Sequence, residues 1–362
     1  MKSFTIHLRK LDWTLITVAM LLVSFGLLSI YSSSVGKEDF LNFKKQIIFF
    51  GIGFFLMMLI SFLDWRSLRE DPYLNLIIYF LCLIALIGLF FFAPEIRGVR
   101  AWYKLGPISI DPIEFIKIVL MIILAKYFSM RHIEMYRVRH ILLSGLYVLI
   151  PVVLIFFQPN LGSVLILVSL WLGILIISGI KLRHFLILLL CFLLILILGW
   201  SSLLKDYQKE RILSFFYPID PLGVSWSQNQ AKIAVGSGGL LGQGISRGSQ
   251  TQYGFLPEPQ TDFIFSAVAE ETGLLGVALL FILFSILIWR ILKIARLATS
   301  NFPRLFASGL IILLVSQIFI HIGMNLGILP IIGISLPLIS YGGSGLIAIF
   351  CGLGILESIK TH

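Results

Sequence analysis

The chain has 362 residues, a formal net charge of +10, and a composition that is 58% hydrophobic and only 13% charged. A soluble core does not need so much apolar surface, so the composition excludes the soluble fold classes. The positive charge does not indicate nucleic acid, because the basic residues are scattered between apolar blocks; anionic lipid headgroups are the expected partners.

About ten apolar blocks follow one another along the chain, each of the length that crosses a bilayer as a helix. In chain order they cover 11–31, 44–63, 72–93, 112–129, 139–157, 161–180, 183–203, 263–289, 304–327 and 336–357. The first block is too long, and too closely followed by others, to be a cleaved signal peptide. We therefore predict an all-α polytopic membrane protein, with residues 1–362 forming a single membrane domain.

Lysine and arginine residues between the blocks predict the orientation of the chain. The short segments on the same side as the two termini hold the stronger basic clusters, which include Arg66, Arg69, Arg131, Arg137, Arg139, Lys181, Arg183, Arg290, Lys293 and Arg296. Because basic short loops stay inside, both termini are expected in the cytoplasm. Segments 94–111 and 204–262 are then expected outside, the second as one large extracytoplasmic loop.

The fourth block opens with the ionisable residues Glu114 and Lys117, and Arg97 and Arg100 precede Trp102 in the segment before it. Glu114 and Lys117 are three residues apart, which places them on one helix face about a turn below the outer surface. A mutual salt bridge and a functional role explain this spacing equally well. The arginines suit either a phosphate at headgroup depth or ordinary anchoring at the membrane interface.

The segment 204–262 differs in composition from everything around it, and it contains the glycine-rich run 236–244. Glycines allow a ligand to approach the backbone, and their N–H groups can form an anion nest. No Gly-Lys-Ser/Thr follows, so the run is not a nucleotide-binding P-loop, and a flexible turn is the favoured interpretation. The segment lacks the charge bias of disorder, so we expect it to pack onto the outer membrane surface.

Asp262 stands where this polar segment enters the eighth block. A carboxylate at the boundary between water and hydrocarbon is a natural place for a general base. The pair Thr261-Asp262 before an apolar run is equally the signature of a helix N-cap. These residues leave both interpretations open.

Further polar residues lie deeper in the last three blocks. Glu270 and Glu271 follow Asp262 on the same predicted helix, about 12 Å further along; a proton path would explain them, but pairing with another helix is favoured. His321 and Asn325 indicate a buried polar contact rather than a metal site, since nothing nearby completes a ligand set. Small residues around Ser340 predict close helix packing.

Taken in order, these segments resemble the SEDS family, the RodA/FtsW/SpoVE group of bacterial membrane proteins, over most of the chain. Each segment alone is a weak match, but their joint order and spacing are specific. They are Gly236-Ser237-Gly238-Gly239, Phe255-Leu256-Pro257-Glu258, Thr261-Asp262-Phe263-Ile264-Phe265, Ala269-Glu270-Glu271, Ile322-Gly323-Met324, Leu329-Pro330, Pro337-Leu338 and Ser340-Tyr341-Gly342-Gly343-Ser344. The compact length and the opening Leu11-Asp12-Trp13 are more similar to the RodA branch than to FtsW.

The resemblance implies an inverting peptidoglycan glycosyltransferase outside the bacterial cytoplasmic membrane. Such an enzyme polymerises lipid II, a disaccharide-pentapeptide on undecaprenyl pyrophosphate, and works with a class B penicillin-binding protein, the transpeptidase, and with other cell-wall elongation machinery. The resemblance places the family's essential acid on Asp262, its polar fourth-span residues on Glu114 and Lys117, and the arginine before its tryptophan on Arg100. The chain departs from the family pattern at Arg97, Asp111, Ile113, Asn160 and His321.

The resulting hypothesis makes Asp262 the general base that deprotonates the sugar 4-hydroxyl of one substrate, which attacks the anomeric carbon of another. Undecaprenyl pyrophosphate leaves, so cations must meet its charge. The residues expected to bind substrate and pyrophosphate are Arg100, Lys117, Glu114, Lys232 and Arg247, with Glu258, Thr261, Glu271 and Ser340 in supporting roles. No resident cofactor is predicted; Mg²⁺ or Mn²⁺ is compatible with a pyrophosphate leaving group, and its ligands stay unknown.

Other functions remain open. A septal or sporulation polymerase of the same family, a lipid II flippase or transporter, and a noncatalytic scaffold would all share the apolar blocks. A flippase places its key charges near the midplane of a central cavity, whereas Asp262, Arg100 and Lys117 are expected near the outer surface. This placement favours the enzyme.

Overall fold

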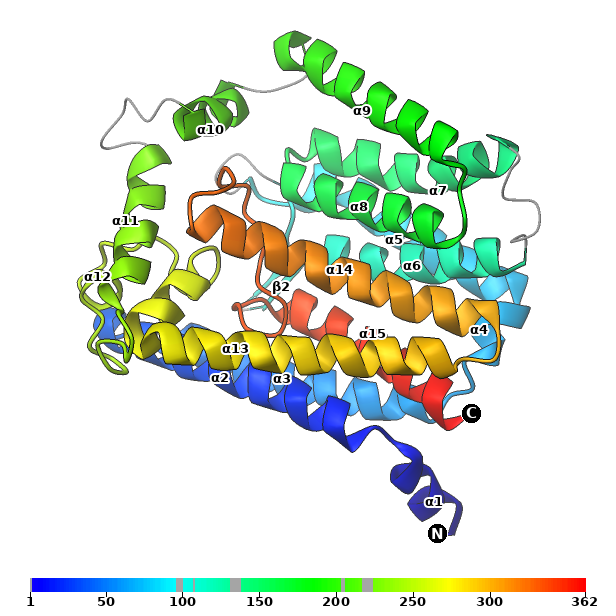
Figure 1. Ribbon diagram of the computed structural model, residues 1–362, viewed down its shortest axis with the longest axis horizontal. Coiled ribbons are helices and arrows are strands. Elements are labelled where there is room, and N and C mark those ends of the chain that lie inside the picture. The colour runs from blue at the N-terminus through cyan, green and yellow to red at the C-terminus, as the bar shows by residue number, and fades with distance from the viewer. Residues whose placement is uncertain (1, 96–99, 107, 131–137, 203–205, 217–223) are drawn as a thin grey trace.

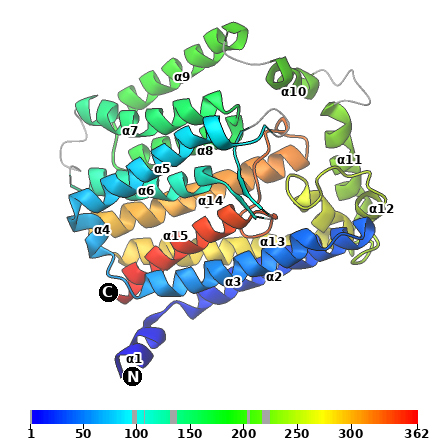
Figure 2. The same ribbon diagram turned by 180° about the vertical axis from the view of Figure 1, so that it is seen from behind.

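Helices long enough to cross a bilayer form the body of the computed structural model, which describes residues 2–95, 100–106, 108–130, 138–202, 206–216 and 224–362 (Figures 1 and 2). Seven of those described are apolar enough for a span by length and composition: α2 (Trp13–Lys37), α3 (Leu41–Ser61), α5 (Pro72–Phe92), α7 (Val138–Phe157), α13 (Ile264–Leu297), α14 (Asn301–Asn325) and α15 (Gly343–Thr361). Three more complete the bundle: α6 (Pro112–Ser129), α8 (Leu161–Ile177) and α9 (Leu182–Ser202). The predicted all-α membrane fold is confirmed.

The remaining elements are short. They are α1 (Lys2–Lys10), α4 (Arg66–Glu70), the strands β1 (Tyr103–Leu105) and β2 (Ile108–Ile110), α10 (Asp206–Phe216), α11 (Val224–Ser237) and α12 (Ser249–Gln252). The two strands form an antiparallel hairpin, and β2 packs against α15. Much of the segment 204–262, which the sequence suggested only as a loop, is therefore helical where it is described.

Asp-Pro pairs set the starts of two spans. The side chain of Asp71 accepts hydrogen bonds from the N–H groups of Tyr73 and Leu74, and Asp111 accepts one from Ile113. In each case the next residue is proline, which lacks the N–H that a first helical turn leaves unpaired and already has a helical φ. Helices α5 and α6 therefore begin where an Asp-Pro pair meets an apolar run.

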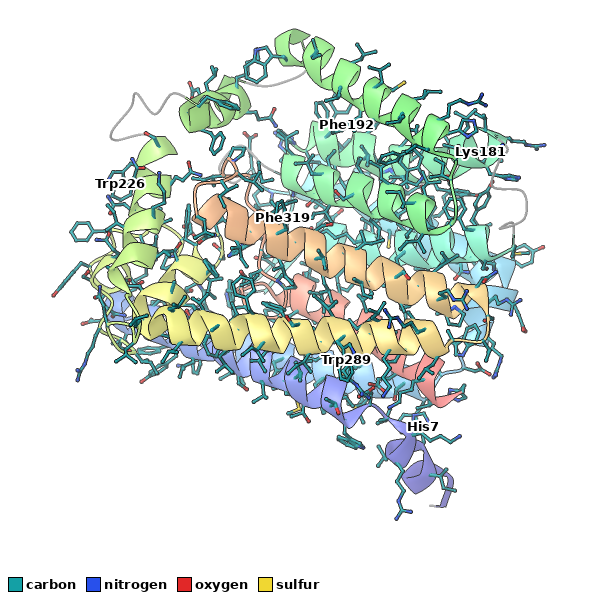
Figure 3. All side chains as sticks on the ribbon, in the orientation of Figure 1. His7, Lys181, Phe192, Trp226, Trp289 and Phe319 are labelled. Carbon is teal, nitrogen blue, oxygen red and sulfur yellow. The ribbon has the colours of Figure 1, made fainter. Side chains whose placement is uncertain are left out.

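Helices α6, α14 and α15 are the most enclosed parts of the bundle. α14 packs on α6, α8 and α13, while α15 packs on α3 and α6. The contact between α3 and α15 is close because Gly354 faces the backbone of Met57, where a Cβ atom would stand 2.8 Å from the carbonyl oxygen. The outer faces instead carry exposed apolar side chains, such as Trp289 on α13 and Phe319 on α14 (Figure 3), as expected for surfaces that contact lipid.

The connections gather at the two ends of the bundle. The hairpin, helices α10–α12 and the connection between α14 and α15 lie at one end, while α1 and the C-terminus lie at the other (Figures 1 and 2). The described parts of segments 94–111 and 204–262 therefore lie at the end of the bundle opposite α1 and the C-terminus, and which end faces the cytoplasm stays a prediction.

The tenth predicted span begins later than its sequence suggests. The block 336–357 was expected to be helical from its first residue, but α15 starts at Gly343 and residues 336–342 form turns. Leu338 has a φ of +66° within these turns, a conformation that a helix does not allow. The seven residues before α15 instead make contacts at the candidate site described below.

A buried ion cluster joins α2, α13 and α15 at the end that holds the termini. The carboxylate of Asp12 accepts hydrogen bonds from Arg290 Nε at 3.1 Å and from the backbone N–H of Leu15, which it caps. Lys360 Nζ lies 3.4 Å from Asp12 Oδ2. The backbone N–H of Asp12 donates to Glu357 at 2.8 Å. Burial alone would raise the pKa of Asp12, but the bonds from Arg290 and Leu15 outweigh it and hold the pKa below its ordinary value of 3.8.

Asp12→Asn is expected to lower the free energy of unfolding by about 3 kcal/mol, because Arg290 loses its buried partner while asparagine can still cap α2. The matched control is Asp64→Asn, since Asp64 pairs with Arg66 on the surface with side chains 46% and 48% exposed; its effect should stay below about 1 kcal/mol. Thermal unfolding in detergent measures both. The stability contributed by Asp12 should be present at neutral pH and be lost as the pH falls below about 4, a dependence that Asp12→Asn should lack. Equal losses from the two variants would contradict the assignment.

Candidate functional site

Asp262 lies in a tight turn just before α13. The N–H groups of Thr261 and Phe263 both donate to the carbonyl of Glu258, at 3.2 and 3.3 Å, and Glu258 itself has a φ of +44°. Helix α13 begins at Ile264, so the N-cap position belongs to Phe263, whose side chain makes no capping bond. The assigned N-cap of α13 thus lies one residue after Asp262.

Asn325, at the end of α14, supplies the cap instead. Its Oδ1 accepts hydrogen bonds from the backbone N–H of Ser266 at 3.1 Å and from the Ser266 hydroxyl at 2.7 Å. Its Nδ2 donates to the carbonyl of Asp262 at 2.9 Å. One buried amide thus holds the first turn of α13 and the backbone of Asp262 in a fixed relation, which confirms the predicted buried polar contact at this position.

The connection between α14 and α15, residues 326–342, holds the same turn from the other side. Ser340 donates its hydroxyl to the carbonyl of Thr261 at 2.9 Å, and the N–H of Tyr341 donates to the carbonyl of Gln260 at 2.8 Å. The carboxylate of Asp262 faces this connection, since a Cβ atom on Gly333 would lie 3.9 Å from Asp262 Oδ2. Ser340, which the sequence predicts both as part of a close-packing run and as a supporting residue, makes a hydrogen bond at this site.

Three side-chain amides that the sequence did not single out complete the support. Gln46 on α3 donates to the carbonyl of Ser340 at 3.2 Å and accepts from the N–H of Gly342. Gln260 accepts from Asn42 at 2.7 Å and donates to Ser34 on α2. A buried glutamine in an otherwise apolar block, such as Gln46, was the available signal, because amides at membrane depth must find partners.

The start of α15 extends the site to α6. The Ser344 hydroxyl accepts a hydrogen bond from the N–H of Asp111 at 2.8 Å, and a Cβ atom on Gly345 would lie 3.5 Å from Glu114 Oε2. Glu114 in turn pairs with Lys117 at 2.6 Å, with only 15% and 4% of their side chains exposed. Burial and the charge of Glu114 raise the pKa of Asp111 to about 7. Residues 326–345 therefore lie between the Asp262 turn and the Glu114–Lys117 pair.

The other predicted cations occupy separate settings. Arg100 pairs with Glu95 at 3.2 Å on the surface and donates to the carbonyl of Phe90. The side chain of Lys232, on α11, lies against Gly327 in the α14–α15 connection. Arg247 is exposed beside Gly244. Arg97 lies outside the described residues. Of the cations assigned in advance, Lys117 is the buried one, and Lys232 is the one from the outer segment that contacts the connection.

Glu270 and Glu271 both make structural pairings. Glu270 accepts hydrogen bonds from the N–H groups of Gln250 and Thr251, at 2.7 and 3.1 Å, and from the Thr251 hydroxyl. Glu271 accepts a hydrogen bond from the hydroxyl of Ser32 on α2. These two acids attach the outer segment to α13 and α2, so the favoured pairing interpretation is confirmed. The supporting role expected for Glu271 stays a prediction.

The glycine-rich run forms turns, as its sequence predicts, and these turns pack closely against α13. The N–H groups of Gln243 and Gly244 donate to the carbonyls of Glu270 and Glu271, at 2.9 and 3.0 Å. The backbones approach so closely that a Cβ atom on Gly238 would overlap the carbonyl oxygen of Ala269. The run thus binds the backbone of α13 at the bend where Gly273 has a φ of +64°.

Gly238→Ala is expected to destabilise the fold by about 3 kcal/mol, because an added methyl group cannot fit against backbone atoms. The matched control is Gly236→Ala, two residues earlier at the end of α11, where a Cβ atom would meet nothing within 4 Å. Alanine should be neutral or slightly favourable there, since it is the better helix former. The shift in thermal unfolding midpoint checks both, and a destabilised Gly236→Ala with an intact Gly238→Ala would contradict this account.

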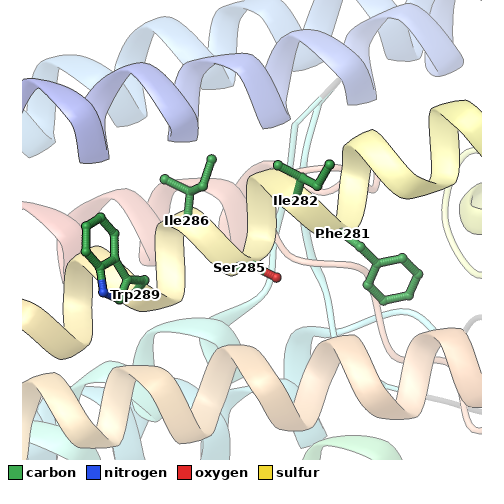
Figure 4. A pocket seen from close by; sticks show the side chains of 5 residues that line it. All are labelled: Phe281, Ile282, Ser285, Ile286 and Trp289. Atoms are coloured by element: carbon green, nitrogen blue, oxygen red, sulfur yellow. The ribbon is translucent and has the colours of Figure 1, made fainter.

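Hollows of the molecular surface do not mark this site. The hollow shown in Figure 4 has a volume of about 340 Å³ and is lined by Phe281, Ile282, Ser285, Ile286 and Trp289 of α13. A second one, of about 470 Å³, lies along α9. Both are apolar and face outward, as grooves between lipid-facing side chains do, and neither is lined by Asp262. Within the described residues, no group of three His, Cys, Asp or Glu side chains could hold a metal ion.

Comparisons with known proteins match nearly the whole chain. Residues 12–362 match a family model described as FTSW_RODA_SPOVE, cell cycle protein. The chain is 36% identical to the peptidoglycan glycosyltransferase MrdB of Escherichia coli, over 97% of this chain and 94% of that one. It is 34% identical to stage V sporulation protein E of Bacillus subtilis, over 97% of each. Its fold is similar to a chain of a peptidoglycan synthase complex that coordinates polymerization and crosslinking, with a TM-score of 0.81, 31% identity and 97% of each chain covered.

Proposed function

This chain belongs to the FtsW/RodA/SpoVE family, and on that premise we propose that it polymerises lipid II into glycan strands during cell elongation, with Asp262 as the general base. The enzyme class rests on the relatives named peptidoglycan glycosyltransferases, which align over 97% of the chain; the chain is an enzyme of this class. The role in elongation is supported by the segment Leu11-Asp12-Trp13, which is similar to the RodA branch, and a septal or sporulation role is the alternative within the family.

The observation that carries the proposal is the support of the Asp262 turn from several elements. Asn325 on α14, Ser340 in the α14–α15 connection and Gln260 with its partners on α2 and α3 all hold the backbone around this carboxylate. A base is effective when its own position does not have to be organised during the reaction. A turn fixed by buried amides at the end of the bundle meets this requirement.

The reaction then follows from the chemistry of the groups. Asp262 accepts the proton of the 4-hydroxyl of one lipid-linked sugar as its oxygen forms a bond to the anomeric carbon of the second. The bond between that carbon and the pyrophosphate oxygen breaks, and the electron pair leaves with undecaprenyl pyrophosphate. Attack opposite the leaving group inverts the anomeric centre. The proton on Asp262 passes to water before the next cycle.

The leaving group gathers negative charge, which favours a nearby cation. Lys117 is our candidate, because it is buried beside Glu114 and next to the first turn of α15. Glu114 would hold the ammonium group in place until the pyrophosphate arrives. Lys232, Arg247 and Arg100 are exposed and suit the phosphates and the pentapeptide further out. Among the described residues, no group of three acidic, histidine or cysteine side chains could hold the Mg²⁺ or Mn²⁺ ion.

The setting proposed for the protein is the cytoplasmic membrane, with both termini inside and the Asp262 turn outside. The proposed partner is a class B penicillin-binding protein that cross-links the strands, supported by the similarity to a synthase complex that couples polymerization to crosslinking. Both substrates carry prenyl tails, which explains a site at the membrane surface. The structural pairings of Glu270 and Glu271 leave fewer free charges for a translocation path, so the enzyme is favoured over a flippase.

The experiment that tests the function supplies labelled lipid II to the purified protein in liposomes, alone and with its penicillin-binding partner. The proposal expects glycan strands, separated by length on a gel. Movement of lipid II between leaflets without polymer would support the transporter. If both proteins are folded and there is neither polymer nor movement of lipid II, the result would support a scaffold.

A further inference from the structure

We infer that His321 is a positioning residue for the glycosyl transfer, holding the α14–α15 connection against the Asp262 carboxylate; the inference rests on the proposed role of Asp262. His321 lies on α14 with none of its side chain exposed. It is separate from the groups that the proposed mechanism uses. Its ring contacts Ile334, the residue that follows Gly333, which the carboxylate of Asp262 faces.

The contact is a hydrogen bond from the ring of His321 to the backbone. Nδ1 lies 2.7 Å from the carbonyl oxygen of Ile334. A carbonyl oxygen can only accept, so Nδ1 carries the hydrogen and donates it. The ring's other nitrogen, Nε2, is buried and has no hydrogen-bond partner. The neutral ring therefore contributes one directed bond, and its recipient is the α14–α15 connection.

Ile334 is placed so that this bond controls the surroundings of the base. The preceding residue, Gly333, has a φ of +70° and is the one whose added Cβ atom would lie 3.9 Å from Asp262 Oδ2. The Ile334 side chain is buried against Gly162 at the start of α8. Ile334 is thus held at its side chain by α8 and at its carbonyl by His321.

Helix α14 consequently fixes both sides of the carboxylate. Asn325, one turn beyond His321, donates to the backbone carbonyl of Asp262, while His321 donates to the connection that the carboxylate faces. The spacing of the base from the connection is then set by two side chains of one helix. Loss of the His321 bond would leave the Ile334 carbonyl buried and unpaired, which favours movement of the connection. Small misplacements at a reacting centre reduce rates strongly.

Two substitutions separate positioning from simple packing. His321→Leu removes the hydrogen-bond donor and fills the same space with an apolar side chain. His321→Asn keeps a donor, because asparagine Nδ2 branches from Cγ as histidine Nδ1 does. The matched control is Gln317→Leu, one turn earlier on the same helix, where the residue is also buried and its Oε1 has no hydrogen-bond partner. This variant changes a buried polar group that makes no hydrogen bond to the connection, all of which the structure describes.

The measurements are kcat and KM for lipid II polymerisation and hydrogen exchange of peptides from residues 326–342. We expect His321→Leu to lower kcat by roughly tenfold to a hundredfold, with KM within about twofold because substrate contacts are unchanged. Exchange in the connection should become faster. His321→Asn should restore most of kcat and the slow exchange, and Gln317→Leu should behave as the wild type.

Three results would overturn the inference: unchanged kcat in His321→Leu, an equal loss in Gln317→Leu, or no recovery in His321→Asn while that variant remains folded. A wild-type protein that makes no polymer would instead contradict the proposed function. In that case the exchange rates still decide whether His321 holds the connection, so the two failures can be told apart.

Discussion

Lys117→Met should reduce polymerisation of lipid II at least about a hundredfold, because it removes the buried cation assigned to the departing pyrophosphate. It should also destabilise the protein, since the Glu114 carboxylate, 2.6 Å from Lys117 Nζ, would lose its buried partner. The rate of glycan formation and the thermal unfolding midpoint measure the two effects separately. Arg100→Ala is the exposed comparison, because Arg100 and Glu95 are each about half exposed; it should change stability little.

The double variant Glu114→Gln, Lys117→Met distinguishes a catalytic role from a structural one. Neutralising both partners removes the unpaired buried charge, so much of the stability lost in Lys117→Met should return. The activity should not return, because no cation then meets the leaving group. A double variant that polymerises at the wild-type rate would show that the pair serves only to hold α6 in the bundle.

The parts of the fold that depend on local chemistry could be predicted from the sequence. The apolar blocks predict the spans, and residues such as Asp71 and Asp111, each followed by proline, mark where two of them begin. The length of the last apolar block predicts the start of α15 too early, because residues 336–342 are apolar enough for a helix. Their conformation is decided instead by distant partners, Gln46 on α3 and Thr261 beside the base.

In the candidate site too, residues marked by their own chemistry could be predicted, while those defined by distant partners could not. Asp262, Glu114 and Lys117 were identifiable because charges at membrane depth are costly and need a reason. The roles of Asn325 and Gln260 were not, since an amide gives no indication of which backbone it will bind. The close packing of the glycine-rich run was not predictable for a related reason. Its neighbour is the backbone of α13, more than 25 residues away from the start of the run, and a tight backbone contact leaves no pattern of its own beyond the glycines.

Asp262→Asn is expected to lower the rate of polymerisation by a factor of about 10² to 10⁴, the range that a general base contributes. Asparagine has nearly the same shape but cannot take the proton from the attacking hydroxyl. The fold should be retained, because Asn325 and Ser340 hold this turn by its backbone carbonyls, which the substitution leaves in place. Asp39→Asn is the control, an exposed acid between α2 and α3 at the same end of the bundle, and it should polymerise as the wild type does.

The most direct test of the account is the initial rate at which purified wild type and Asp262→Asn, at equal amounts of folded protein and with the penicillin-binding partner present, convert labelled lipid II into glycan strands. We predict glycan strands from the wild type. The variant should form them at a rate at least about a hundredfold lower, because it lacks the general base. A variant rate within a few-fold of the wild type would contradict the assignment of Asp262 as the base.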